Sequence, residues 1–311
     1  MRTLLDGIAL TQRHVLPDGA QLAYDVLGSV HFGCPTPIVL IGGLSNVAGD
    51  WERLSTVLAQ KRPVLVYDHR GIGKSTYSTA QRTDVITIES MARDLVDLIK
   101  ALEWPEVILC GFSMGGVIAQ KLVLLPSHPS QPTPLPFKVT HVLLTGTTVN
   151  PLQASFLLKT RPADELSDAQ KLDLVRKGVE LSFDHEWVKN NKPRLEWFVK
   201  RMVVGRPART LAKQGDAMSS FDFGDSHKHF PSIPVLVIHG IVDRMVPLKE
   251  GQIIVDRISS AQFVQFGDSA GQIPHGTFGH HWWEYFDVQV WQDVVEVFAA
   301  QGPSGVAKAR L

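Results

Sequence analysis

The sequence predicts a three-layer α/β sandwich, in which helices cover both faces of a mostly parallel, eight-stranded sheet. Short apolar runs alternate along the chain with amphipathic segments of helical period. From the third run onward they are almost continuously apolar, which is typical of parallel strands buried on both faces. The first two runs flank Asp18-Gly19, which indicates an antiparallel hairpin.

The elements follow in chain order. Strands are expected at 12–16, 21–27, 37–41, 63–67, 106–110, 139–145, 234–239 and 261–266. Helices are expected between them at 50–60, 87–102, 114–125, 247–258 and 287–300. The helix at 87–102 has the clearest pattern, because Met91, Leu95 and Leu98 fall on one stripe.

One interval interrupts this alternation. About ninety residues without a strand signal separate Thr145 from Pro234, and this is too long for a simple connection. Their composition favours helices over 164–181, 185–204 and 208–218. We therefore expect a core domain made of 1–146 and 233–311. The inserted segment, residues 147–232, is expected to form a helical cap over the active face.

Composition excludes some classes of function. Basic and acidic residues number 31 each, so the formal net charge is zero and no basic surface for nucleic acid is indicated. The two cysteines, Cys34 and Cys110, are too few for a disulfide framework, and both are expected to be buried. The residues carry no signal for the oligomeric state.

Localisation signals are few. Asp6 and Gly7 interrupt the apolar run of a secretory leader, and no apolar stretch approaches the roughly 20 residues that span a bilayer. The last three residues, Ala309-Arg310-Leu311, resemble a peroxisomal signal, although a frayed basic terminus would read the same. A cytoplasmic or peroxisomal protein is expected.

The strongest chemical signal is the stretch EVILCGFSMGGVIAQKLVLL, residues 106–125. An apolar strand runs into Gly111-Phe112-Ser113-Met114-Gly115 and then into a helix, which is the context of a nucleophile elbow. The sharp turn needs residues without side chains two positions before and after the serine, and Gly111 and Gly115 meet that need. Ser113 is therefore the candidate nucleophile.

A serine hydroxyl needs a base, and the base needs an orienting carboxylate. Asp243 follows the buried run PVLVIH at 234–239, where a carboxylate would point into the crevice at the carboxyl end of the sheet. The alternative is that Asp243 only caps the helix after it. The preceding strand ends in TGTT, which offers no competing carboxylate.

Three histidines, His275, His280 and His281, follow the last strand within the stretch PHGTFGHHWWEYF. Adjacent residues rarely point at one metal ion, so a catalytic base is favoured over a zinc site, and no metal is expected. A stripe of Val290, Val294 and Phe298 in the last helix is compatible with His280. If the buried stripe of this helix is instead Trp291, Val295 and Phe298, His281 is favoured as the base. The tryptophans at 282 and 283 are expected in the core.

These pieces together resemble the α/β-hydrolases that carry a helical cap between core strands six and seven. The matching stretches are IGGL (41–44), DHRGIGKS (68–75), GFSMG (111–115), HGIVDRMVP (239–247) and GHHWWEYF (279–286). The usual Gly-His step of this family favours His280 as the base, with His281 as the alternative. The resemblance also implies an oxyanion hole made by the backbone N–H groups of Leu44 and Met114.

A second glycine-rich stretch, GIGKST at 71–76, has the ending of a phosphate-binding loop. The full pattern requires a glycine at position 68, and Asp68 stands there. Nucleotide binding is therefore not expected. The stretch is interpreted as a structural turn beside the active face.

The predicted function is a serine hydrolase that cleaves a carboxylic ester or lactone of a small to medium apolar substrate without a cofactor. One alternative is an acyl-CoA thioesterase or a C–C bond hydrolase. For the thioesterase, basic residues of the inserted segment would be suited: Lys189, Lys192, Arg194, Lys200 and Arg201. Another class is a non-catalytic ligand receptor of the same fold.

Overall fold

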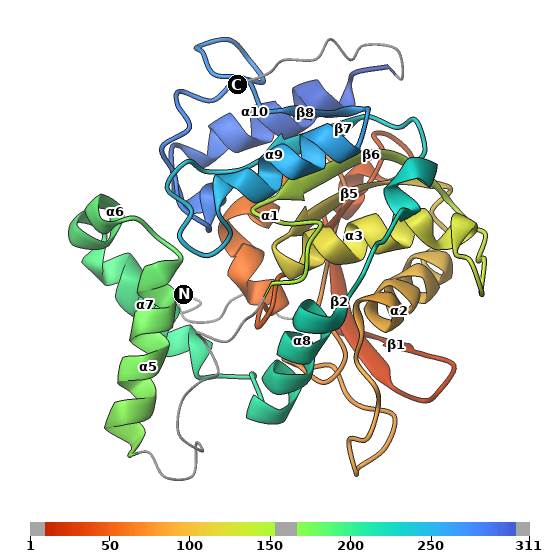
Figure 1. The fold of residues 1–311 in the computed structure, drawn as a ribbon, viewed down its shortest axis with the longest axis horizontal. Helices are drawn as coiled ribbons and strands as arrows, with labels where there is room; N and C mark the ends of the chain where they lie inside the picture. Colours follow the sequence, from red (N-terminus) through yellow and green to blue (C-terminus); the bar gives the residue numbers. More distant parts are fainter. Residues whose placement is uncertain (1–9, 153–166, 303–311) are drawn as a thin grey trace.

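The computed structural model describes residues 10–152 and 167–302, and Figure 1 shows a central sheet with helices on both faces. The eight strands lie in the order β1-β2-β4-β3-β5-β6-β7-β8. β2 runs antiparallel to β1 and to β4, whereas the other neighbours are parallel. The predicted α/β sandwich with a mostly parallel sheet is confirmed.

The strands agree with the apolar runs to within a few residues. They are β1 (Gln12–Val15), β2 (Gln21–Leu27), β3 (Ile38–Ile41), β4 (Val64–Tyr67), β5 (Glu106–Phe112), β6 (Lys138–Thr145), β7 (Val235–Ile238) and β8 (Ala261–Phe263). Every residue of β3, β4 and β7 is buried, as their continuous apolar pattern requires. β8 is shorter than predicted, because Phe266 forms an isolated bridge with Ile273 instead of extending the strand.

Five helices pack directly on the sheet. They are α1 (Glu52–Leu58), α2 (Ile88–Ala101), α3 (Met114–Leu124), α9 (Leu248–Arg257) and α10 (Val288–Ala299). One apolar cluster joins α2, α3 and α9 to one face, and a second joins α1 and α10 to the other. The predicted helix at 50–60 begins as a 3-10 turn over Ala48–Trp51. Two separate cores therefore fix the sheet from both sides.

Most helices of the inserted segment lie together at one side of the sheet in Figure 1, and the last of them lies apart. Its described helices are α5 (Asp168–Leu181), α6 (His185–Asn190), α7 (Lys192–Met202) and α8 (Ala208–Ser220). The prediction of a single helix over 185–204 is wrong. Asn191 leaves the helical conformation, and Pro193 lies in the first turn of α7, where a missing N–H costs nothing. Residues 164–166 of the first predicted helix lie outside the described residues.

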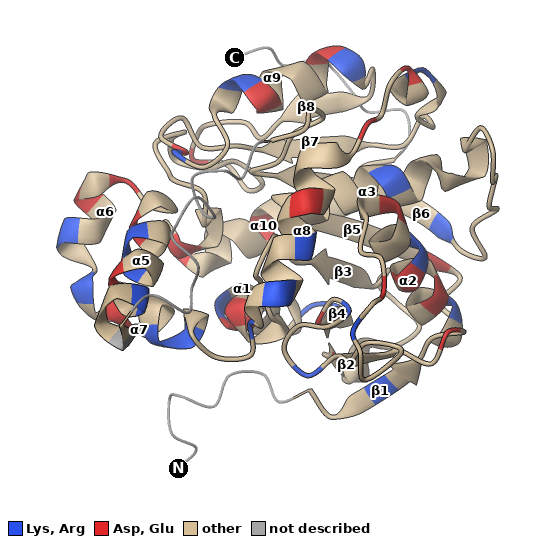
Figure 2. Ribbon diagram, turned by 60° about the horizontal axis from the view of Figure 1, so that its bottom comes forward, with Lys and Arg blue, Asp and Glu red and all other residues tan. Residues whose placement is uncertain are grey.

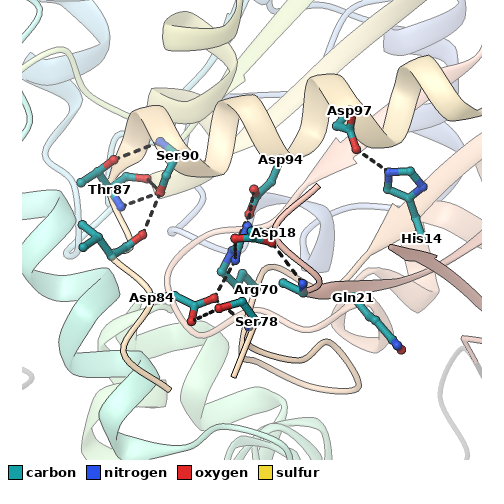
Figure 3. A network of polar contacts seen from close by, with 12 residues as sticks. His14, Asp18, Gln21, Arg70, Ser78, Asp84, Thr87, Ser90, Asp94 and Asp97 are labelled. Carbon is teal, nitrogen blue, oxygen red and sulfur yellow. Dashed lines mark hydrogen bonds and ion pairs between the residues drawn. The ribbon is translucent and has the colours of Figure 1, made fainter. Parts of the chain in front are cut away.

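The turn after β4 is held by charge, as Figure 3 shows for Arg70. The guanidinium of Arg70 contacts carboxylates of Asp18 at 2.5 Å, Asp84 at 2.6 Å and Asp94 at 2.8 Å. These acids come from the β1–β2 turn, the 78–84 loop and α2. Beside it, Asp68 accepts from the N–H of Lys74 at 2.7 Å. An acidic side chain therefore occupies the place where a phosphate-binding loop would hold its anion.

The remaining expectations concern the surface. Figure 2 shows basic and acidic residues interspersed over α5 and α7. Cys110 is buried in β5, but the expectation for Cys34 is wrong, because it lies exposed in the loop between β2 and β3. Within 10–152 and 167–302, no helix is long and apolar enough to cross a membrane. The tripeptide Ala309-Arg310-Leu311 lies outside the described residues.

Candidate active site

Ser113 is the single residue between β5 and α3, and its backbone conformation is strained. Its φ is 53° and its ψ is −120°, a region that residues with a side chain rarely adopt. The conformation is held at both ends. The N–H of Ser113 donates to the carbonyl of Thr145 at 2.9 Å, and its carbonyl accepts from the N–H of Gly116 at 2.9 Å. The surrounding backbone therefore holds the serine clear of both elements.

Close backbone contacts explain the glycines around this turn. A Cβ on Gly111 would lie 2.4 Å from the carbonyl oxygen of Gly115, and one on Gly115 would lie 2.0 Å from that of Ile41. Neither position can accept a side chain without displacing backbone. Gly116, which the sequence analysis did not single out, is equally restricted, because its Cβ would lie 2.5 Å from the Thr147 hydroxyl.

Asp243 lies in the turn after β7 and bonds to His280. The Nδ1–H of His280 donates to Oδ2 of Asp243 at 2.8 Å, and the two side chains are 5% and 1% exposed. The other oxygen, Oδ1, accepts from the N–H groups of Met245 at 2.8 Å and Val246 at 2.9 Å. Two backbone donors therefore fix the carboxylate, and the carboxylate fixes the imidazole ring.

His239, at the end of β7, supports this turn. Its Nε2–H donates to the carbonyl of Val246 at 2.8 Å, and burial lowers the pKa of the ring. Gly146 supports the pair from the other side, with a φ of 49°. A Cβ there would lie 3.1 Å from Nδ1 of His280. Gly146 is the glycine of the TGTT run at the end of β6, and its place at a strand end was the only sequence signal for this role.

The side chains of the three histidines in the last loop lie in different surroundings. His281 does not bond to Asp243 but lies among Phe183, Phe198 and Trp283, with ring centroids 5.1 to 5.3 Å away. Burial lowers the pKa of His281 well below its usual value. His275 is exposed and lies against the ring of Phe286. The described residues contain no group of side chains that could hold a metal ion.

The two tryptophans after His281 belong to the core, as expected. Trp282 and Trp283 are buried to within 1% of their surface. Trp283 packs against Trp51 with ring centroids 4.6 Å apart, and Trp282 packs against Trp291 at the same distance. They support the loop from beneath and do not line the cavity described next.

A cavity of about 260 Å³ opens beside Ser113, between the core and the inserted segment. Ser113, His280 and His281 lie on its core side, together with Phe112 and Met245. The opposite wall is made of apolar side chains from α5, α7 and α8: Leu174, Val179, Phe198, Met202 and Leu211. The structure therefore brings the predicted nucleophile and base to one largely apolar cavity.

Two charged side chains of the cavity neutralise each other. Arg206, in the link between α7 and α8, donates to Oδ2 of Asp50 at 2.6 Å, and both side chains are buried. The sequence analysis missed both residues, because neither lies in a recognisable motif. Because the two buried charges pair with each other, neither adds an unpaired charge to the cavity.

The loop after β3 lies against the elbow. A Cβ on Gly43 would lie 3.0 Å from the Cβ of Ser113. The N–H of Asn46 donates to the carbonyl of Gly43 at 3.2 Å, which closes a turn over Leu44 and Ser45. Within the described chain, the N–H groups of Leu44 and Met114 form no protein hydrogen bond.

Comparison with known proteins gives a family for most of the chain. The family described as alpha/beta hydrolase fold matches residues 36–271. A similar curated protein is a putative carbamate hydrolase RutD of Caulobacter segnis, 26% identical over 229 residues, which cover 73% of this chain and 81% of that protein. The protein of the same name from Azorhizobium caulinodans is 33% identical, but over 100 residues only.

Solved structures share the fold at low sequence identity. A hydrolase from Pseudomonas aeruginosa superposes with a TM-score of 0.72 at 21% identity, over 93% of this chain and 98% of that one. The enol-lactonase from Burkholderia xenovorans gives a TM-score of 0.72 at 20% identity, over 93% and 100%. An esterase from Exiguobacterium antarcticum gives 0.68 at 18%, over 93% and 99%.

Proposed function

Because the chain belongs to the family described as alpha/beta hydrolase fold, we propose that it is a serine hydrolase that cleaves a carboxylic ester or lactone. One observation carries the proposal. The hydrogen bond between His280 and Asp243 lies at the same cavity as Ser113, which stands in the strained turn of a nucleophile elbow. A histidine held by a carboxylate beside a partly buried serine that lines the same cavity is the arrangement that activates a hydroxyl.

The reaction follows from these positions. The Oγ of Ser113 attacks the substrate carbonyl carbon, and His280 takes the hydroxyl proton. The tetrahedral oxyanion accepts from the N–H groups of Leu44 and Met114. When it collapses, the bond to the leaving alcohol breaks and His280 returns the proton to that oxygen. Water then attacks the acyl-enzyme by the same steps, which releases the acid and restores Ser113. Asp243 stays ionised and stabilises the imidazolium.

The cavity supports a small to medium apolar substrate. A volume of about 260 Å³ and walls of Leu, Val, Met and Phe favour an uncharged acyl group. In this proposal the inserted segment acts as the cap, since α5, α7 and α8 close the cavity opposite Ser113. Substrate choice then depends mainly on that wall.

The thioesterase alternative is less well supported. A CoA thioester would be recognised by free basic groups near the cavity, but two of the five basic residues considered above are already engaged. Arg194 pairs with Glu284 at 2.7 Å, and Arg201 lies 3.8 Å from Asp50. A ligand receptor is also less well supported, because it has no need for a strained serine or a carboxylate-held histidine. The name of the curated relatives makes a carbamate the second candidate bond, and the same steps would cleave it.

A substrate panel tests the proposal. The purified protein is assayed with p-nitrophenyl esters of increasing acyl length, with lactones, with an aryl carbamate and with acyl-CoA. We expect turnover of short to medium esters or lactones, and Ser113→Ala should reduce it by about four or more powers of ten. A Ser113→Ala variant with wild-type turnover would show that another group performs the reaction.

A further inference from the structure

The turn at 43–46 holds an unfavourable backbone conformation at Ser45. The carbonyl of Gly43 accepts from the N–H of Asn46, so Leu44 and Ser45 occupy the two central positions of a β-turn. Ser45 has a φ of 69°, whereas Leu44 is not among the residues with positive φ. This combination defines a type II turn, whose third position is normally glycine. A serine at that position needs support from outside the turn.

The inserted segment supplies that support through two buried side chains. Oε1 of Gln214, on α8, accepts from the N–H of Ser45 at 3.0 Å. Nε–H of Arg206 donates to the carbonyl of Ser45 at 2.7 Å. Gln214 is fully buried, and the guanidinium of Arg206 is fixed by further bonds to Asp50 and to the carbonyls of Arg201 and Val204. Both polar groups of Ser45 are thus held by the same segment.

The rest of the loop is anchored to the core instead. Nε2–H of the buried His69 donates to the carbonyl of Gly42 at 2.9 Å. The N–H of Val47 donates to Asp50 at 3.0 Å, and that of Ala48 donates to Asp68 at 2.7 Å. The turn is therefore fixed by the core before and after Ser45, while Ser45 itself depends on the inserted segment.

We propose that Gln214 and Arg206 are positioning residues for the oxyanion hole: by holding Ser45 in the type II turn, they keep the N–H of Leu44 directed at the site. This inference rests on the proposed function, in which Leu44 is a donor. Type I and type II turns differ by a rotation of the peptide between the two central residues. Here that peptide joins Leu44 to Ser45, and Gln214 bonds to its N–H. The N–H of Leu44 belongs to the preceding peptide, which shares the Cα of Leu44 and is displaced when its neighbour rotates.

The consequence is that the hydrolytic site is complete only when the inserted segment is docked. Without the acceptor on Gln214, Ser45 relaxes toward a negative φ, and the residue that carries the donor changes its conformation with it. An oxyanion donor acts only when it is fixed within tenths of an ångström of its place. The inserted segment thus contributes to rate as well as to substrate choice.

The kinetic test uses Gln214→Met, which keeps the volume and removes the acceptor. We expect kcat for a short p-nitrophenyl ester to fall about 10- to 100-fold, less than the roughly 100- to 1000-fold for outright loss of an oxyanion donor because the N–H is displaced and not removed, with KM changed by less than about 3-fold. Gln214→Glu keeps the acceptor oxygen and should restore most of kcat. Gln292→Met is the matched control, because Gln292 is a buried glutamine that bonds to Val57 far from the cavity.

An unchanged kcat in Gln214→Met, or equal losses in Gln214→Met and Gln292→Met, would overturn the inference. A loss that appears only in KM would do the same, since it would assign Gln214 to substrate binding. If the wild-type protein turns over no ester, the proposed function is wrong. That result is distinguishable from failure of this inference, which would appear only in the comparison of the variants with an active wild-type protein.

A second measurement does not depend on activity. Amide hydrogen exchange at Ser45, followed by NMR, reports directly on the bond to Gln214. We expect exchange at Ser45 to be at least about 10-fold faster in Gln214→Met than in the wild-type protein, with the amide of Val47 unchanged because the core holds it. Equal protection of Ser45 in both proteins would show that Gln214 does not hold the turn.

Discussion

The two sides of the cavity are built in different ways. On the core side the candidate nucleophile and the candidate acid lie in turns that follow β5 and β7, and backbone hydrogen bonds fix them: Ser113 by Thr145, and Asp243 by Met245 and Val246. On the side of the inserted segment, helices present apolar side chains such as that of Phe198. The two sides therefore have different roles. The turns after the strands fix the positions of the reacting groups, whereas the helix faces shape the space for the substrate and so select it.

The two sides nevertheless meet at a few polar contacts. The N–H of His280 donates to the carbonyl of Ser182 at 2.9 Å, and the hydroxyl of Tyr285 donates to Asp184 at 2.7 Å. Ser182 and Asp184 lie between α5 and α6. The loop that carries the proposed base is therefore tied to the inserted segment, as the turn at Ser45 is.

The largest expected effect separates the two adjacent histidines on the core side. His280→Ala removes the proposed base and should reduce ester turnover by about four to six powers of ten. His281→Ala removes a ring that packs against the inserted segment but does not bond to Asp243, so turnover should fall by no more than about 10-fold. Steady-state assays of both variants check this. Equal losses would show that the assignment of the base is wrong.

The next effect tests the carboxylate that orients the base. In Asp243→Asn the remaining oxygen can still accept from Met245 and Val246, so the turn should fold as before. The amide nitrogen then faces Nδ1 of His280 and cannot accept from it, which favours the wrong tautomer. We expect kcat to fall about 10³- to 10⁴-fold. Asp243 does not cap α9, whose N-cap is Pro247. A loss below 10-fold would mean that Asp243 only holds the turn through Met245 and Val246.

A smaller effect is expected on the side of the inserted segment. Phe198→Ala enlarges the cavity without touching a reacting group. The ratio of kcat/KM for a long acyl ester to that for a short one should rise by about 10-fold, since a few methylenes contribute this much in an apolar pocket. A panel of acyl lengths measures it. A uniform loss over all lengths, without a shift in preference, would contradict selection by this wall.

The smallest effect compares buried histidines of the two regions. Burial lowers the pKa of His69, in the core, and of His227, at the end of the inserted segment, to about 4 in each case. Both rings are neutral in the folded protein at pH 7. As the pH falls from about 6.5 to 4, the unfolded chain takes up protons that the folded chain cannot, so stability is lost across this window.

One of these two contributions can be removed. Between pH 6.5 and 4 the free energy of unfolding of the wild-type protein falls as the pH decreases. In His227→Phe this slope should be smaller by at most about 1.4 kcal/mol per pH unit. Urea unfolding at several pH values measures the slope. An identical slope in the variant and the wild-type protein would show that His227 is not held neutral by burial.

The core side could be predicted from the sequence because its chemistry coincides with local signals. A buried strand, two glycines around a serine and a helix mark Ser113, and a strand end marks Asp243. The last helix was a poor guide to the base. It buries Trp291 and Val295 of the frame that favoured His281, but also Val294 of the frame compatible with His280, so its burial does not choose between the two. The choice comes from the bond of His280 to Asp243. A 3-10 turn at Trp282–Glu284 lies between, so the helix register does not transfer to the histidines.

The side of the inserted segment could be predicted only as helices. Its contributions to the site depend on contacts across long separations in sequence, such as that of Gln214 with Ser45, and no periodic pattern reports them. Asn191 splits a helix that composition alone would continue. Arg206 and Asp50 each look like solvated surface charges in the sequence, and only the folded chain brings them together.

The most direct test of the central claim is labelling with a fluorophosphonate probe, followed by mass mapping of the modified peptide. We expect one label on Ser113 in the wild-type protein and in His281→Ala, and none in Ser113→Ala. Labelling should be strongly slowed in His280→Ala, because the hydroxyl loses its base. A wild-type protein that stays unlabelled, or that is labelled at another residue, would contradict the assignment of Ser113 as the nucleophile.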